Sequence, residues 1–439
     1  MIGTFTKNTL ITIVTQGLTF VFGIGISVII ARILGPEGKG IYSLAILLPS
    51  FLVYFTSFSI GQASIFYLGK RRYSPKEVFG NNIIYAVLTS TFAILIGLII
   101  VFFFSNKLFP GVEPKYLFLA LFLIPFHLFL GYIGFILLGL QKIKKYNFVS
   151  FFRVLLLLIL IGVLLLGFRF GIAAAIIAEI LAFLIACIVL FFMTKQETSG
   201  ISLKLNKDYF KDSFLYGIKV YLGSILSFLS HRMGMWLINI FLNPLMVGFY
   251  SISIGLSEKL WLISDSIGTV LFPKISSEND KVKIKEFTPL VFRNVLFIVT
   301  LIAVLLFAIA HWLITLLYSD AFSESTKPFQ ILLIGAVTIS GWKILESDLK
   351  GRGRPMLNTY ATGISAVLNI ILNILWIPKF GILGAAWAAT ISYTVMLLIT
   401  LVIYSKISGN RITDLLFLKK SDLALYRNFL IIIKEKLKH

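Results

Sequence analysis

The sequence of 439 residues has a single cysteine, Cys187, and few charged residues. One cysteine cannot form an intrachain disulfide, and no cysteine/histidine spacing typical of a zinc site is present. Because Cys187 lies inside an apolar run, we expect a buried packing thiol. Charged residues make up 13% of the chain, against roughly 25% in soluble domains. With 58% hydrophobic residues and a mean hydropathy of +0.95, the composition indicates a polytopic membrane protein.

The motifs of soluble enzymes are also missing from the sequence. No P-loop, dinucleotide-binding fingerprint, HExxH or nucleophile elbow occurs in its required context. The first apolar run is long enough to remain in the membrane as a span, and no short leader with a small-residue cleavage site precedes it. We therefore predict a membrane transporter rather than an enzyme, without a metal or cofactor, and with H⁺ or Na⁺ as the coupling ion if there is one.

Long apolar runs dominate the chain. Runs of about 20 apolar residues match the roughly 30 Å hydrocarbon core of a bilayer. A chain in lipid must satisfy its backbone hydrogen bonds internally, so these runs are predicted to be helices. The twelve predicted transmembrane helices lie near residues 9–31, 41–67, 81–105, 115–139, 147–167, 171–193, 214–242, 245–272, 290–317, 328–348, 356–378 and 381–405.

Basic residues predict the orientation. Most lie at the N-terminus, in alternate loops such as "KRRYSPK" (70–76) and "KIKK" (142–145), and in the tail, whereas the opposite loops hold few. Under the positive-inside rule both termini are cytoplasmic, in a plasma membrane of the bacterial inner-membrane type. The net charge of +21 then reflects topology and contact with anionic membrane lipids, not nucleic-acid binding. The basic tail, 411–439, has the spacing of an amphipathic helix on the inner leaflet; a cytoplasmic helix packed on the bundle is the alternative.

The chain repeats itself. "ILGPEGKGIYSLAI" (33–46) shares Leu, Pro, Gly, Tyr, Ser and Ile positions with "FLNPLMVGFYSISI" (241–254), and "FGIAAAIIA" (170–178) resembles "FGILGAAWA" (380–388) at nearly the same spacing. A weaker pair is "GLQKIKKYN" and "DLKGRGRPMLN". We predict an all-α integral membrane fold of two six-helix bundles, 1–200 and 201–410, related by a pseudo-two-fold axis along the membrane normal.

Two cations lie deep inside predicted spans. In "SFLSHRMGMWLINIF", Arg232 is about 16 Å from the turn at Asn243, and Lys259 is about 22 Å from the same side at 1.5 Å per residue. A charge at the bilayer centre costs at least ~2.5–3.5 kcal/mol. Two interpretations remain open: an ion pair of Arg232 with Glu258, which adjoins Lys259, or a cationic lining of a water-filled cavity.

Other polar residues inside spans are weaker candidates. Gln16 and Gln62 either line the same cavity or form hydrogen bonds between helices. Asp265, His127 and Glu179 are candidates for proton or sodium coupling, with a satisfied interhelical hydrogen bond as the alternative. Three further cations lie close enough to cytoplasmic ends to snorkel: Arg153, Lys219 and Lys343.

The stretches "ARILGPEGKGIYSLAI", "DLKGRGRP" and "FGILGAAWAA" resemble the polysaccharide-repeat (Wzx-type) flippases of the multidrug/oligosaccharidyl-lipid/polysaccharide exporter superfamily. The resemblance covers the whole chain. It implies translocation of polyprenyl-pyrophosphate-linked oligosaccharide to the outer leaflet, for polysaccharides such as O-antigen, by alternating access. It also implies a cationic central cavity, to which Arg232 and Lys259 would belong by position, and a polysaccharide polymerase and glycosyltransferases as partners.

Charge supports an anionic cargo, because an Arg in a cavity offers paired donors to diphosphate oxygens. A cation-coupled drug or metabolite antiporter of the same superfamily is the first alternative, and it would favour buried carboxylates. A non-transporting membrane scaffold of a polysaccharide assembly complex is the second. A membrane glycosyltransferase or polymerase needs a catalytic outer loop, and the predicted outer loops are too short. The chain also lacks the two extra helices of lipid II flippases.

Overall fold

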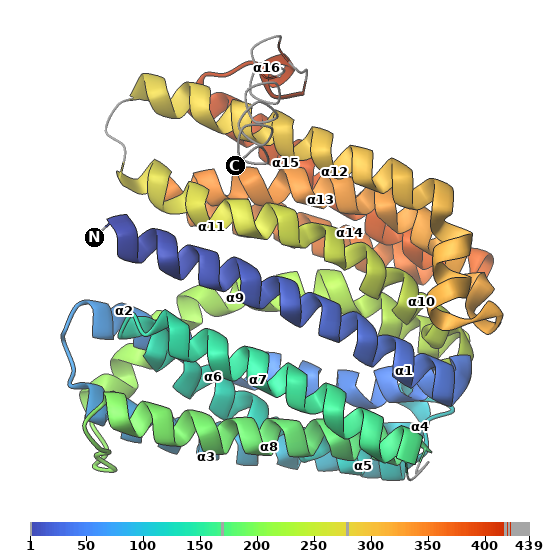
Figure 1. The fold of residues 1–439 in the computed structure, drawn as a ribbon, viewed down its shortest axis with the longest axis horizontal. Helices are drawn as coiled ribbons and strands as arrows, with labels where there is room; N and C mark the ends of the chain where they lie inside the picture. The colour runs from blue at the N-terminus through green and yellow to red at the C-terminus, as the bar shows by residue number, and fades with distance from the viewer. Residues whose placement is uncertain (1, 168–170, 278–280, 417–418, 420–421, 423–439) are drawn as a thin grey trace, which may run out of the picture. The chain divides into compact units, whose positions relative to one another are not determined.

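The computed structural model describes residues 2–167, 171–277, 281–416, 419 and 422, and their regular elements are all helical (Figure 1). The α-helices are α1 (Ile2–Thr56), α2 (Ile60–Gly69), α3 (Pro75–Ile99), α4 (Ser105–Leu108), α5 (Pro114–Leu121), α6 (Leu123–Gly139), α7 (Ile143–Ile161), α8 (Gly171–Glu197), α9 (Lys207–Phe241), α10 (Pro244–Ser257), α11 (Trp261–Ser277), α12 (Lys281–Tyr318), α13 (Thr326–Gly351), α14 (Pro355–Phe380), α15 (Ile382–Ser408) and α16 (Ile412–Leu416). Short π or 3-10 turns are η1 (Ile100–Phe104), η2 (Gly162–Gly167), η3 (Glu258–Leu260) and η4 (Asp320–Ser325).

Within the described residues, ten helical stretches are long and apolar enough to cross a membrane. The prediction of a multi-pass helical membrane protein is therefore confirmed. The stretches differ from the predicted spans in two places. Helix α1 joins the first predicted span to most of the second, and the predicted span 245–272 is divided into α10 and α11 by the turn η3.

The bend inside α1 is at Gly35, whose φ of 67° and ψ of −179° are not helical. Glycine takes this conformation without the steric cost that a Cβ would add. Pro36 follows and begins a new helical segment, a position where its missing N–H is tolerated. The segment ends where Phe58 and Ser59 adopt positive φ, just before α2. Each of the two repeated motifs, 33–46 and 241–254, thus contains a Pro at which a helical segment begins, Pro36 in one and Pro244 in the other.

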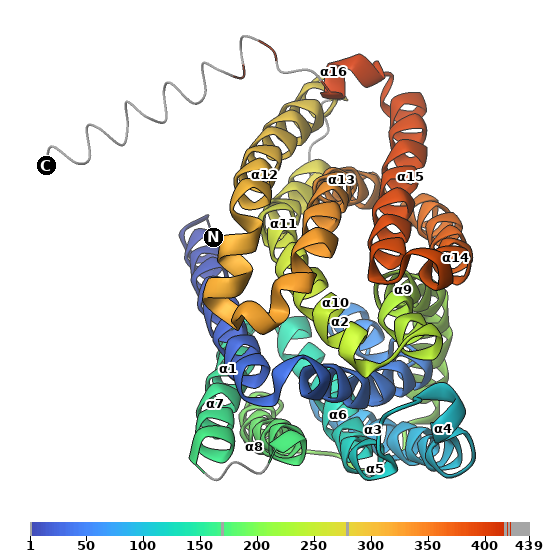
Figure 2. The ribbon, with the colours of Figure 1, turned by 90° about the vertical axis from the view of Figure 1, so that its right-hand side faces the viewer.

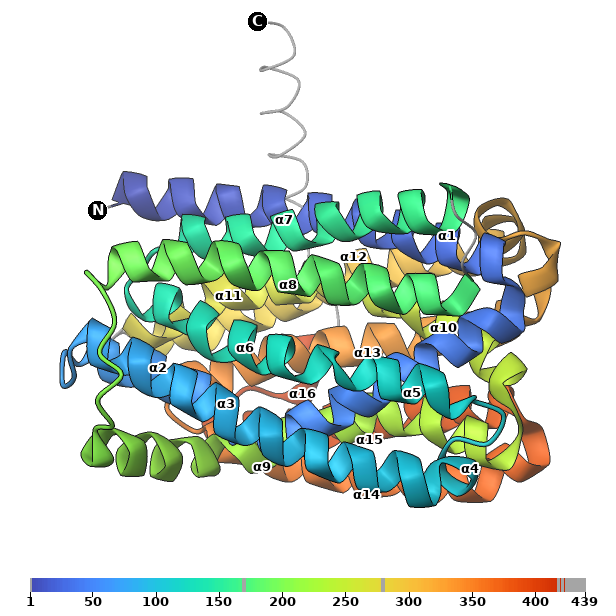
Figure 3. The same cartoon turned by 90° about the horizontal axis from the view of Figure 1, so that it is seen from below.

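Backbone contacts divide the chain into two units. Unit 1 contains Met1–Ile252, Ile314–Ser325 and Ile374–Ile382; unit 2 contains Ser253–Leu313, Thr326–Asn373 and Leu383–His439. In unit 1, α1, α7 and α8 pack side by side (Figure 2), and α3 and α2 pack on α6 (Figure 3). Small residues of α8 such as Ala174, Ala178 and Ala182 are fully or almost fully buried, and they allow close helix approach. Cys187 is buried, which confirms the packing thiol.

Repeated motifs meet each other inside unit 1. A Cβ on Gly40 would lie 1.7 Å from the Pro244 carbonyl oxygen, and a Cβ on Gly248 would lie 1.9 Å from that of Pro36. The second repeated pair shares a conformation, because Gly171 and Gly381 have φ of 67° and 60°. The glycines of the repeat thus serve two purposes: close backbone contact, which leaves no room for a Cβ, and left-handed turns, which glycine adopts without steric cost.

In unit 2, α11 packs along α13 (Figure 1). The start of the tail contacts α12 through Asp422 and Arg293. Arg293 donates to both carboxylate oxygens of Asp422 at 2.7 and 2.9 Å, and both side chains are buried. The Arg293 guanidinium, with a smaller contribution from the Lys419 backbone N–H, holds the pKa of Asp422 below its usual range. Most of the predicted amphipathic tail helix lies outside the described residues.

Candidate functional site

Arg232 lies in α9, which runs unbroken from Lys207 to Phe241. The helix starts where the Asn206 side chain accepts a hydrogen bond from the Tyr209 backbone N–H, a standard N-cap that fixes the register of the helix. Arg232 is half-buried. It lies in unit 1, whereas the half-buried Glu258 and Lys259 occupy the turn η3 in unit 2. The choice between an Arg232–Glu258 ion pair and a cationic cavity therefore stays a prediction.

An apolar cavity of about 490 Å³ lies against one face of α9. Its wall on α9 is formed by Leu229, Met233 and Trp236, which share one helical face beside Arg232. The other walls come from α1, α3, η1, α4 and the residue after α4: Leu48, Phe51, Leu52, Phe55, Thr56, Ile96, Ile100, Leu108 and Phe109. The one lining hydroxyl, on Thr56, donates to its own helix at the Leu52 carbonyl. Such a cavity suits hydrocarbon and not sugar.

Glu179 lies at the centre of a buried charged cluster formed by α1, α7 and α8. The Tyr42 hydroxyl donates to Glu179 Oε2 at 2.6 Å. Lys39 and Glu179 are only 8% and 9% exposed, and both Lys39 and Arg153 interact electrostatically with the Glu179 carboxylate. Because the carboxylate faces two cations, the cluster ties three helices together at the cost of desolvating its charges.

His127 lies next to the same cluster. Its ring centroid is 4.1 Å from that of Phe183, and the Arg153 guanidinium lies 4.5 Å from the Phe183 centroid. His127 Nδ1 is 3.1 Å from the Leu123 carbonyl oxygen of its own helix. His127 and Glu179 both interact electrostatically with Arg153, so the structure places two candidates for ion coupling around one arginine.

Two cations of this cluster, Lys39 and Arg153, were not recognised as site residues from the sequence. Lys39 lies between the predicted spans 9–31 and 41–67, but the structure buries it in the segment of α1 that begins at Pro36. Its spacing of three residues from Tyr42 was the available signal, since helical residues three apart share a face. Arg153 was expected to snorkel, yet its guanidinium stacks on Phe183 beside Glu179.

The remaining candidates lie apart from this cluster. Asp265 accepts from Lys343 Nζ at 2.6 Å, which links α11 to α13 within unit 2. Lys343, expected to snorkel, also lies 5.4 Å from the centroid of the Trp261 ring. Gln16 and Gln62 are both exposed, on α1 and α2. Their predicted place in a shared cavity stays a prediction.

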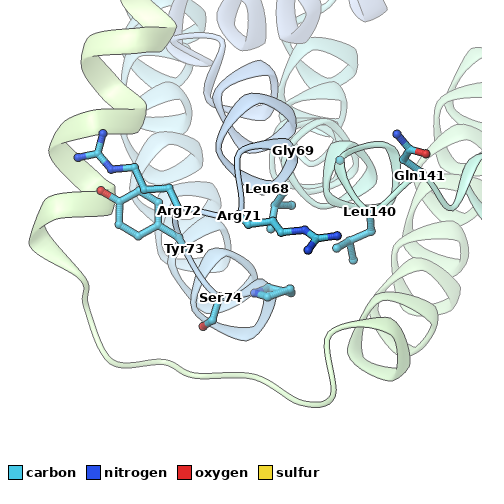
Figure 4. A pocket seen from close by; sticks show the side chains of 10 residues that line it. Leu68, Gly69, Arg71, Arg72, Tyr73, Ser74, Leu140 and Gln141 are labelled. Carbon is cyan, nitrogen blue, oxygen red and sulfur yellow. The ribbon is translucent and has the colours of Figure 1, made fainter.

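A second cavity, of about 780 Å³, lies at the ends of α2 and α6 in unit 1 (Figure 4). Its lining comes from the basic loop after α2 and from the turn after α6: Leu68, Gly69, Arg71, Arg72, Tyr73, Ser74, Pro75, Gly139, Leu140 and Gln141. Arg72 pairs with Asp212 at 2.6 Å. The Tyr73 hydroxyl donates to the same carboxylate at 2.5 Å, and burial followed by this hydrogen bond raises the pKa of Tyr73 to about 12.

Comparison with protein families supports the resemblance seen in the sequence. Residues 29–327 match the model of a family described as polysaccharide biosynthesis protein. The chain belongs to this family. The resemblance to polysaccharide-repeat flippases is thereby confirmed, and two relatives are named as a flippase and a polysaccharide biosynthesis protein rather than as enzymes.

Two curated relatives carry informative names. The probable low-salt glycan biosynthesis flippase Agl15 of Haloferax volcanii is 30% identical over 45% of this chain and 43% of its own length. The capsular polysaccharide biosynthesis protein CapF of Staphylococcus aureus is 22% identical over 87% of this chain and 94% of its own. The first curated relatives are matched over less than half of their length.

Solved structures share the fold. The lipid II flippase MurJ in an inward closed conformation superposes with a TM-score of 0.75 at 16% identity, over 92% of this chain and 89% of MurJ. An inward-facing multidrug resistance transporter of the MATE family superposes with a TM-score of 0.71 at 14% identity, over 89% and 94% of the two chains. At such identities the likeness shows the transporter fold and does not specify the cargo.

Proposed function

We propose that this family member translocates a polyprenyl-pyrophosphate-linked oligosaccharide from the cytoplasmic to the outer leaflet, by alternating access of twelve helices in two six-helix bundles. The reciprocal contacts of Gly40 with Pro244 and of Gly248 with Pro36 support a pseudo-two-fold axis. The observation that carries the cargo assignment is a half-buried arginine, Arg232, within an otherwise apolar stretch of α9. In a low-dielectric site its planar fork suits two diphosphate oxygens at once.

Each part of such a cargo has a matching chemistry in the protein. Arg232, with Lys259 as a second cation, would dock the diphosphate, and the sugars would follow a polar route with the exposed Gln16 and Gln62 among its candidates. The apolar cavity beside Leu229 and Met233 would accept part of the prenyl chain, because its lining offers hydrocarbon contacts. Asp265, His127 or Glu179 would carry a coupling H⁺ or Na⁺ if the transport is ion-driven.

Flipping of a fluorescent polyprenyl-pyrophosphate oligosaccharide in proteoliposomes tests the proposal. We expect Arg232→Gln to lower the rate by about tenfold or more, because a hydrogen bond to a charged group contributes about 1.5–3 kcal/mol. Arg232→Lys should retain part of the rate. Lys219→Gln is the matched control, since it removes a cation from an exposed position of the same helix.

Equal rates in all these proteins would leave Arg232 as a structural charge. Transport by the wild type of a cationic drug, with no flipping of the lipid, would favour the antiporter. Absence of both activities would favour a membrane scaffold of polysaccharide assembly.

A further inference from the structure

The cavity at the ends of α2 and α6 takes no part in the proposed translocation. Helices α2 and α6 end at Gly69 and Gly139, where two predicted spans leave the membrane on the predicted cytoplasmic side. The cavity between the two turns therefore lies at the level of lipid headgroups. Its lining combines the aliphatic side chains of Leu68 and Leu140 with polar groups of the basic loop.

Both turns place a side chain where such turns usually have glycine. Arg71 and Gln141 adopt left-handed φ of 53° and 58°. A backbone hydrogen bond closes each turn. The Arg72 N–H donates to the Tyr67 carbonyl, and the Lys142 N–H donates to the Leu137 carbonyl. Glycine is the usual residue at this position because it lacks a Cβ. The corresponding turn after α13 in unit 2 does use a glycine, Gly353 with φ of 74°.

The two neighbouring arginines of the loop point in different directions. Figure 4 shows the Arg71 guanidinium extending toward Leu140 and Gln141, whereas Arg72 extends the opposite way beside Tyr73. The charge of Arg72 is balanced by Asp212. Among the residues that the structure describes, no carboxylate is within ion-pair distance of the Arg71 guanidinium. The cavity thus contains one cation that is not balanced by a neighbouring carboxylate.

We propose that this cavity binds the phosphate of an anionic lipid headgroup, with Arg71 as its charged ligand and the Gln141 amide as a second donor. A guanidinium presents paired N–H groups that match phosphate oxygens. The membrane surface supplies lipid phosphate at high local concentration to a basic loop. Leu68 and Leu140 supply apolar surface for the first carbons of the lipid chains. This inference does not depend on the proposed translocation.

The test is the binding of phosphatidylglycerol to the full chain in detergent, followed by native mass spectrometry, with phosphatidylcholine as the neutral comparison. We expect Arg71→Gln to weaken the tightest phosphatidylglycerol site by about tenfold, the effect of one charged hydrogen bond. Lys76→Gln is the matched control, because it removes the same charge from an exposed position in the first turn of α3, just after the loop and outside the cavity lining. It should change binding by less than about twofold.

A glycine variant separates binding from folding. Arg71→Gly removes the side chain but relieves the left-handed conformation, so its thermal unfolding temperature should equal or exceed that of the wild type while the lipid is lost. Retained lipid binding in Arg71→Gly would overturn the role of Arg71. Equal losses of phosphatidylglycerol binding in Arg71→Gln and Lys76→Gln would mean that only the overall surface charge attracts the lipid, and would overturn the proposal.

Inorganic pyrophosphate distinguishes the source of the phosphate. If it binds with the same dependence on Arg71 while phosphatidylglycerol does not bind, the lipid assignment is wrong. Flipping activity in Arg71→Gly proteoliposomes is a separate readout, so loss of the lipid site and failure of the proposed translocation remain distinguishable.

Discussion

The backbone of Gly40 lies against the Pro244 carbonyl so closely that a Cβ would sit 1.7 Å from its oxygen. Gly248, the counterpart of Gly40 in the repeated motif, lies against Pro36 in the same way. The proline that begins each repeated helix thus packs its carbonyl against the glycine of the other repeated helix. Small residues permit this approach in membrane proteins, where dispersion contacts replace the hydrophobic effect between helices.

Gly40→Ala should destabilise the protein by about 1–3 kcal/mol or more, because the added methyl would overlap a backbone carbonyl that cannot rotate away. Thermal unfolding of the detergent-purified chain measures the effect. Gly131→Ala is the matched control in another helix, since no atom lies within 4 Å of the position that its added methyl would take. Equal unfolding temperatures for the two variants would mean that the contact is not maintained.

Glu179→Gln should be strongly destabilising. It removes the carboxylate charge that attracts the cations of Lys39 and Arg153, and the ammonium of Lys39, a residue only 8% exposed, then lacks a nearby counter-charge. Tyr42→Phe removes only one hydrogen bond to Glu179 and should cost about 1.5–3 kcal/mol because that bond is to a charged group. Unfolding temperatures of both variants test the ranking. A smaller effect of Glu179→Gln than of Tyr42→Phe would show that the carboxyl is already protonated.

Filling the apolar cavity should slow flipping without loss of stability. Met233→Trp adds bulk to a wall of the 490 Å³ cavity, and filling a void usually stabilises a protein. Under the proposed function, the prenyl chain would then lose part of its site. Leu222→Trp, at a position 58% exposed on the same helix, is the control in the proteoliposome assay. Faster or unchanged flipping by Met233→Trp would exclude the cavity as a site for the chain.

Asp422→Asn should release the start of the tail from α12. The buried bidentate pair with Arg293 would be lost, whereas Asp414→Asn removes only an exposed pair with Lys419, which contributes about 0–1 kcal/mol. Limited proteolysis after residue 408 should therefore be faster in Asp422→Asn than in Asp414→Asn. Identical cleavage rates would contradict the role of the buried pair.

The same pair predicts a pH dependence for the tail. Because the pKa of Asp422 is lower in the folded than in the unfolded chain, its stabilising contribution is complete above the unfolded value near 3.8 and is lost as the pH falls through the folded value. Proteolysis of the tail should be unchanged between pH 7 and 5, where the carboxylate stays charged. An increase within that range would show that another group controls the contact.

Several features of the site were readable in the sequence because they depend on local chemistry. Arg232 stood out because a cation in a long apolar run is costly, and Cys187 was placed correctly in the interior because its neighbours are apolar. Asp265 and Lys343 were singled out separately, yet their ion pair could not be derived, since they are on helices far apart in the chain. The burial of Lys39 could not be read from the sequence, where it falls between two predicted spans, because the chain after the bend at Gly35 continues directly as a helix.

The sequence by itself determined the helical membrane class and the internal repeat, because apolar run length and backbone hydrogen bonding in lipid leave few other solutions. The tertiary structure decided which charges neutralise each other and where the backbone approaches most closely. Glu179 on α8 interacts electrostatically with Lys39 on α1 and Arg153 on α7. The Arg71 guanidinium extends toward Leu140 and Gln141, whereas that of Arg72 pairs with Asp212. These side-chain contacts depend on how helices pack and on the conformation of single residues in the turns. An isolated helix carries no information about the neighbour that its side chains will face.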